Sequence, residues 1–203
     1  MIITDKFIFI NYPKTGSTFV RKTIKEIHNK NATSKFWNLL SKKETFYRIY
    51  KAPNLRAFNV PDRKDSFNEH GLRNQIPDKY KHLKIYSIKR SIFEILVSIY
   101  EYRDWEKTLP FSYKNIKEDY PNYPEISFKE FIEISYKKSF YAGHPKIGEN
   151  ALKIGFVSIN LILFFCKEPF KILMNWDHHS ISKIKEEINE VVFLKNEVLN
   201  NDL

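Results

Sequence analysis

The stretch from residue 7 to residue 28 constrains the fold of this chain more than any other. An apolar run ends at Asn11, the polar turn Tyr12-Pro13-Lys14-Thr15-Gly16-Ser17-Thr18 follows, and a helical pattern begins at once. We predict a buried strand over 6–11 and an amphipathic helix over 17–28. The predicted apolar side of that helix carries Phe19, Thr23 and Ile27. A strand that feeds a helix through so short a turn is typical of α/β proteins.

The rest of the chain continues this alternation of strands and helices. We predict strands over 57–60, 84–89 and 190–194, and helices over 36–40, 91–102 and 150–166, with further helices starting near Ser127, Ser182 and Glu197. A surface loop is predicted over 108–124, because that stretch is rich in Pro, Tyr and Asn. No internal repeat or domain boundary is visible. We therefore expect one α/β domain over 1–203, with a mainly parallel central sheet flanked by helices.

The composition excludes several classes of protein. A chain of 203 residues with 42% hydrophobic and 16% aromatic residues is not a disordered segment. Cys166 is the only cysteine, so neither an intrachain disulfide nor a cysteine zinc cluster can form. The longest apolar segment, 154–166, is too short to span a bilayer, and the amino terminus shows no signal peptide pattern. We expect a soluble, cytoplasmic protein without a membrane span.

The net charge of +10 favours an anionic partner, but it does not choose one. A general bias toward lysine explains the excess equally well, because the lysines are spread along the whole chain. Charge alone therefore leaves nucleic acid, a nucleotide, an acidic glycan and a membrane surface open as partners.

The turn at residues 13–18 is a candidate anion site. Backbone N–H groups at a helix start lack intrahelical partners and attract anions. Gly16 permits close approach, Lys14 adds a full positive charge, and three hydroxyls can donate hydrogen bonds: Thr15, Ser17 and Thr18. The order of residues is not that of a Walker A loop, because the lysine precedes the glycine. The alternative is an ordinary strand-to-helix turn with Ser17 or Thr18 as the N-cap.

A second candidate site lies at the end of the predicted strand 84–89. Arg90 leaves the carboxyl end of that strand, and Ser98 follows in the next helix. Ligands of parallel sheets bind beyond the carboxyl ends of the strands, which is also where the 13–18 turn is expected. The planar guanidinium of Arg90 and the hydroxyl of Ser98 can together hold a phosphate. Taken alone, an arginine at a strand end is more often structural.

These two segments together resemble the sulfotransferases that use 3′-phosphoadenosine 5′-phosphosulfate (PAPS). Tyr-Pro-Lys-Thr-Gly-Ser-Thr is similar to the loop that binds the 5′-phosphosulfate in that family, and Arg90 with Ser98 is similar to its 3′-phosphate site. The resemblance implies a P-loop-like three-layer fold and PAPS as co-substrate, bound by Pro13, Lys14, Thr15, Gly16, Ser17, Thr18, Arg90 and Ser98. The sequence departs from the family at Ser91 and Ile92, where Asp or Asn followed by Pro is usual.

The resemblance also implies the chemistry. His70, twenty residues before Arg90, matches the catalytic base of the carbohydrate sulfotransferase branch, and Lys14 would stabilise the leaving group of an in-line transfer to a carbohydrate hydroxyl. Glu69 and His144 are alternative bases, and a surface or capping role for His70 is the other interpretation. No metal is expected. The chain is similar to a bacterial or viral soluble branch of the family, and the resemblance leaves open a carboxyl-terminal extension.

Two further functions compete with this interpretation. A P-loop-type nucleotide kinase is disfavoured by the order of the turn residues and by the lack of an evident magnesium-binding carboxylate beside them. A basic nucleic-acid-binding module without catalysis is disfavoured because no RNP, zinc-finger or helix-turn-helix pattern is present. We therefore expect a glycan acceptor and no specific nucleic acid partner, while the oligomeric state stays open.

Overall fold

The computed structural model describes residues 1–4, 6–32, 47–49, 70–103, 105–106, 115–138, 147 and 150–195. The chain divides into two compact units, and each is described by itself below. The first unit comprises residues 1–53, 67–90 and 189–203, and the second comprises 54–66 and 91–188. The predicted elements at 36–40, at 57–60 and beyond residue 196 lie outside the described residues.

A five-stranded sheet forms the centre of the first unit, counted over the described residues. Its strands lie in the order β3 (Tyr47–Ile49), β1 (Ile2–Thr4), β2 (Phe7–Phe9), β4 (Lys84–Lys89) and β5 (Val191–Lys195). β2, β4 and β5 run parallel, whereas β1 is antiparallel to both of its neighbours. The prediction of an α/β chain with parallel strands is therefore confirmed for β2, β4 and β5. The strands β1 and β3 were not predicted.

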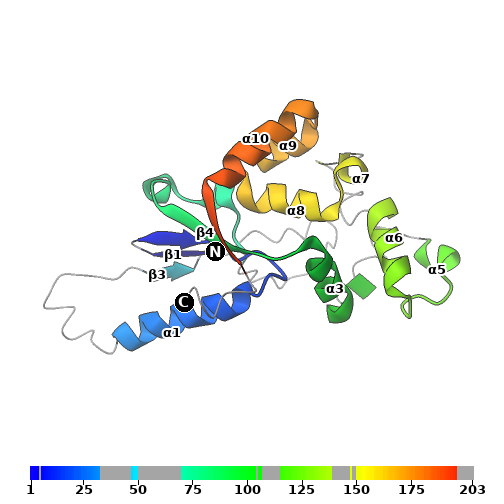
Figure 1. The fold of residues 1–203 in the computed structure, drawn as a ribbon, viewed down its shortest axis with the longest axis horizontal. Coiled ribbons are helices and arrows are strands. Elements are labelled where there is room, and N and C mark those ends of the chain that lie inside the picture. The colour runs from blue at the N-terminus through cyan, green and yellow to red at the C-terminus, as the bar shows by residue number, and fades with distance from the viewer. Residues whose placement is uncertain are drawn as a thin grey trace, which may run out of the picture. The chain divides into compact units, whose positions relative to one another are not determined.

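Helix α1 (Ser17–Ala32) covers one face of this sheet (Figure 1). Val20 is 3% exposed and packs with Ile24 against apolar side chains of the sheet: Ile2, Phe9 and Ile88. The predicted apolar side was wrong, because Phe19 and Ile27 are each 54% exposed. Val20 and Ile24 are four residues apart, so they share one helix face, and that face meets the sheet.

The second unit is helical in its described part. Its helices are α3 (Ile92–Tyr102), α5 (Ile116–Asp119), α6 (Phe128–Lys138), α7 (Asn150–Ile154), α8 (Phe156–Phe165), α9 (Pro169–Met174) and α10 (His178–Asn189). The predicted starts of α3 and α6 are confirmed, because Ser91 and Ser127 each accept a hydrogen bond from the backbone N–H three residues later. Helix α10 begins earlier than predicted, since Asp177 caps it by accepting from the Ser180 N–H at 2.8 Å.

Two predictions in this unit, one of a helix and one of a loop, were wrong. The stretch 150–166 is not one helix, because Gly155 adopts a left-handed φ of 81° and separates α7 from α8. The expected surface loop contains α5, whose Ile116 is 1% exposed and packs beside α6 (Figure 1). Tyr and Pro in that stretch indicated a loop, yet buried side chains hold part of it in the core.

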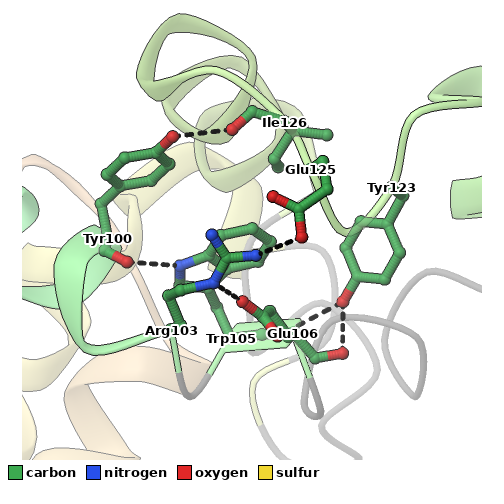
Figure 2. A network of polar contacts seen from close by, with 7 residues as sticks. All are labelled: Tyr100, Arg103, Trp105, Glu106, Tyr123, Glu125 and Ile126. Atoms are coloured by element: carbon green, nitrogen blue, oxygen red, sulfur yellow. Dashed lines mark hydrogen bonds and ion pairs between the residues drawn. The ribbon is translucent and has the colours of Figure 1, made fainter.

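An aromatic cluster forms the core beneath α6, and we name it the Trp105 cluster. Its buried members are Trp105, Ile116, Tyr123, Ile126, Phe131 and Ile134, with Tyr100 packed against them. The rings of Tyr100 and Trp105 are stacked with centroids 5.9 Å apart, and the indole N–H donates to the Tyr100 carbonyl at 3.0 Å (Figure 2). At its rim Arg103 binds the carboxylates of Glu106 and Glu125 (Figure 2).

Tyr123 is the buried titratable group of this cluster. Its hydroxyl donates to the Glu106 carbonyl (Figure 2), and its ring is 9% exposed. Burial, with a smaller contribution from the Glu106 carboxylate, raises the pKa of Tyr123 to about 12. Cys166, the single cysteine, is fully buried as well, after the end of α8. Among the described residues, no helix has the length and apolarity needed to cross a membrane.

Candidate functional site

The Pro13–Thr18 turn connects β2 to α1 at the carboxyl end of β2. Lys14 and Gly16 both have left-handed backbones, with φ of 62° and 84°. Gly16 adopts this conformation without strain, whereas Lys14 is uncommon there. Where left-handed residues stand beside right-handed ones, successive backbone N–H groups can point toward one side, and such a concave nest binds anions. Helix α1 adds the N–H groups of its first turn to the same place.

Two of the predicted donors in the turn bind the protein itself. The hydroxyls of Thr15 and Ser17 both donate to the Tyr12 carbonyl, at 2.8 and 2.7 Å, and both side chains are buried. Each hydroxyl has one hydrogen, so in this structure these side chains brace the turn. Their direct contact with an anion stays a prediction. Thr18 is exposed, and Pro13 is half-buried.

Arg90 reaches this turn from the carboxyl end of β4. Its Nη1 donates to the Lys14 carbonyl over 3.3 Å, and the side chain is partly buried. The neighbouring strand ends are joined as well, because buried Ser87 donates to the Ile10 carbonyl at 2.8 Å. The structure therefore brings the turn and Arg90 together, as the sequence predicted.

His70 lies at the same edge of the sheet. Its Nδ1 is 2.6 Å from the Asn11 carbonyl oxygen. A carbonyl can only accept, so this contact places the hydrogen on Nδ1 and, in the neutral ring, the lone pair on Nε2. A neutral imidazole with its lone pair on a fixed nitrogen is the form that a general base requires.

Three buried polar residues of the first unit were not predicted. The Asn11 side chain is 1% exposed, and neither its amide nitrogen nor its oxygen makes a hydrogen bond within the described ranges. Arg73, 5% exposed, forms an ion pair with Glu190. Ser87 is a fully buried polar residue of β4. Asn11 and Ser87 could have been found from the sequence, because each is a polar residue within a predicted apolar strand. No sequence pattern connects Arg73 with Glu190, a residue 117 positions away.

The remaining predicted residues are not joined to this edge by any described contact. Ser98 lies partly buried in α3, within the second unit, and its part in a phosphate site stays a prediction. Glu69 and His144, the alternative bases, lie outside the described residues. The described part of the chain contains no group of three or more His, Cys, Asp or Glu side chains that could hold a metal ion.

The arrangement suits an anionic ligand attacked by a hydroxyl. The nest, Lys14 and Arg90 supply backbone dipoles and two positive charges, which would bind phosphate-like groups and stabilise charge that develops on them. His70 would supply a base, and a backbone carbonyl orients its ring.

Comparison with known proteins adds no relative to this description. Neither family models, nor curated proteins, nor solved structures give a match to the chain.

Proposed function

We propose that this chain is a PAPS-dependent sulfotransferase that transfers a sulfuryl group to a hydroxyl, with a carbohydrate as the acceptor. The observation that carries the proposal is the contact between Arg90 and the Lys14 carbonyl. It joins two segments, 76 residues apart in the sequence, that the proposal assigns to phosphate binding. PAPS needs two such elements, one for its 5′-phosphosulfate and one for its 3′-phosphate. A P-loop-like three-layer arrangement is part of this proposal.

The residues divide the binding of the co-substrate between them. The nest at Lys14 and Gly16, with the start of α1, would hold the phosphosulfate, while Arg90 would hold the 3′-phosphate. PAPS supplies the sulfuryl group and is released as adenosine 3′,5′-bisphosphate. The Lys14 ammonium would neutralise the charge that grows on the leaving oxygen, without a metal ion.

His70 would accept the proton of the acceptor hydroxyl at Nε2. The hydrogen bond to the Asn11 carbonyl supports this role, because it keeps the other ring nitrogen protonated. The same hydrogen bond would stabilise the imidazolium that forms when the proton arrives, since a charged donor makes a stronger hydrogen bond.

Ligand binding separates this proposal from its competitors. We expect adenosine 3′,5′-bisphosphate to raise the melting temperature of the protein, and ATP with Mg²⁺ to raise it much less. Arg90→Ala should weaken bisphosphate binding roughly 10- to 100-fold, because a charge-assisted hydrogen bond is worth about 1.5–3 kcal/mol. Thermal shift and calorimetric titration measure both effects.

The matched control is Lys89→Ala. Lys89 is the exposed neighbour of Arg90, so both variants remove one positive charge from the same strand end. Equal weakening by the two variants would mean general charge attraction and would contradict a phosphate site at Arg90. Equal stabilisation by ATP and bisphosphate would favour a kinase, and tight, strongly salt-dependent binding of polynucleotides would favour the nucleic-acid-binding module.

Turnover tests the role of His70. His70→Ala should leave bisphosphate binding nearly intact and slow sulfuryl transfer to a carbohydrate by roughly 10²–10⁴-fold, the usual contribution of general acid–base catalysis. Lys14→Ala should reduce both binding and turnover. His82→Ala is the control, because His82 is an exposed histidine twelve residues along the same segment. Full turnover in His70→Ala would assign the base to another group.

A further inference from the structure

The segment that carries His70 is attached to the first unit at two points. At its start, His70 Nδ1 contacts the Asn11 carbonyl at 2.6 Å. Three residues later, Arg73 Nη2 forms an ion pair with Glu190 Oε2. Between these points the chain is buried, since Leu72 is 2% exposed. The Leu72 N–H donates to the Gln75 side chain at 2.8 Å, which closes the short 3₁₀ helix Arg73–Gln75.

The ion pair holds this segment against the sheet. Glu190 directly precedes β5, which pairs with β4 along its whole length. Arg73 is 5% exposed and Glu190 is 45% exposed, so the charge of the arginine is the buried one. A buried guanidinium is costly unless it has a charged or hydrogen-bonding partner, so removal of the Glu190 carboxylate favours a shift of the side chain or its backbone.

A movement of Arg73 would be passed on to His70. Three residues of extended chain span only about 10 Å, so the imidazole cannot be positioned independently of a clamp three residues away. The hydrogen bond at Nδ1 depends on that position, and the tautomer of the ring depends on the hydrogen bond.

We propose that Arg73 and Glu190 are positioning residues for His70, whose ion pair fixes the place and the tautomer of the imidazole ring. The catalytic meaning of this inference rests on the proposed role of His70 as the base. Under this proposal the two side chains contact neither substrate nor co-substrate, and they act through the segment that they anchor.

The test reads the imidazole directly. Long-range ¹H–¹⁵N spectra of the full chain, with His70 assigned by its loss in His70→Gln, report which ring nitrogen carries the hydrogen. The wild type should show a protonated Nδ1. Glu190→Gln, at a half-exposed position that tolerates the change, should shift the Nδ1 resonance toward the unprotonated range, because the hydrogen bond to Asn11 is lost in part of the molecules.

Glu168→Gln is the matched control. Like Glu190, Glu168 is a partly exposed carboxylate that forms ion pairs. Its partners are Lys171 and Lys183, and it lies in the second unit. This variant should leave the His70 signals as in the wild type. Arg73→Lys keeps the charge and shortens the side chain, so it should give a smaller shift than Glu190→Gln.

A His70 spectrum that is identical in the wild type, Glu190→Gln and Arg73→Lys would overturn the inference, even if the melting temperature falls. Titration with adenosine 3′,5′-bisphosphate separates this outcome from a failure of the proposed function. Intact bisphosphate binding in Glu190→Gln, together with a shifted His70 signal, supports a positioning role. A wild type that binds no bisphosphate contradicts the proposed function, while the spectrum still decides whether the ion pair orients the ring.

Discussion

The Pro13–Thr18 turn and the Trp105 cluster both bury polar atoms, and they satisfy them differently. In the Trp105 cluster the buried indole and phenol hydrogens are donated to backbone carbonyls, and the charges lie at the exposed rim (Figure 2). Beside the turn, two hydroxyls share the Tyr12 carbonyl, and the buried Asn11 amide makes no hydrogen bond within the described ranges. Lys14 also holds a left-handed backbone there.

The Trp105 cluster therefore stabilises the fold, whereas the Pro13–Thr18 turn and its surroundings contain groups that destabilise it. An unsatisfied buried polar group costs about 1–3 kcal/mol, and a strained backbone residue costs a similar amount. Such costs accumulate where a chain needs polar groups in fixed positions, which is the usual condition of a ligand site. Replacing the buried rings of the Trp105 cluster should therefore lower stability, whereas replacing the unsatisfied Asn11 amide beside the turn should not.

The largest expected effect is the loss of the Trp105 ring. Trp105→Ala should lower the free energy of unfolding by about 3–5 kcal/mol, because it removes a side chain that is 2% exposed and packed against three other rings. Urea denaturation followed by circular dichroism measures it. Tyr136→Ala, at a position 78% exposed, is the control and should change stability by less than about 0.5 kcal/mol.

Alkaline pH should weaken the same cluster. The pKa of Tyr123 is raised to about 12 in the folded chain from a usual value of 10, so the folded state holds this proton more tightly. The resulting stabilisation is complete below pH 10 and is lost as the pH rises from 10 to 12, on the order of 2–3 kcal/mol. Tyr123→Phe should remove this loss from urea unfolding curves. Tyr102→Phe, 66% exposed, should retain it.

A smaller effect is expected within the turn. Ser17→Ala removes a buried hydrogen bond to the Tyr12 carbonyl and should cost about 1 kcal/mol. Thr18→Ala, at the exposed neighbouring position, should cost less than about 0.5 kcal/mol in the same thermal unfolding experiment. Equal losses would show that Ser17 does not brace the turn.

The smallest effect should have the opposite sign. Asn11→Leu replaces a buried amide without hydrogen bonds by an apolar side chain of similar size, so stability should stay constant or rise by about 1 kcal/mol. For a chain of this length that is about 2–4 °C in melting temperature, which calorimetry resolves. A clear loss of stability would show that Asn11, like the members of the Trp105 cluster, stabilises the fold.

Local sequence patterns predicted many of the helices and strands but few of the long-range contacts between them. Hydrophobic period and capping residues located β4 at its observed bounds and α3 and α6 at their starts, because these signals act within a few residues. The same reasoning missed β1 and β3, since three-residue strands carry almost no periodic signal. It also extended one helix through Gly155, where a left-handed backbone is needed.

The candidate site shows the same limit. Lys14, Gly16 and Arg90 were predicted because each stands at the end of an apolar strand, and parallel strands bring their ends to one edge. Long-range contacts of the first unit, such as Arg73 with Glu190, join residues whose sequence neighbourhoods share no pattern. The direction of the Thr15 and Ser17 hydroxyls depends on the backbone of the turn, which sequence spacing does not specify.

The pairing of β4 with β5 has a consequence for how the chain folds. Ile85 lies opposite Val191, so nearly all of the second unit is inserted between two neighbouring strands of the first. Pairings of such long sequence separation form slowly, because the loop must close before any contact rewards it. On the ribosome β4 is synthesised long before β5, so the edge of β4 that pairs with β5 stays unpaired during that time. We expect the helical insertion to fold first and so to shorten the effective distance between the two strands.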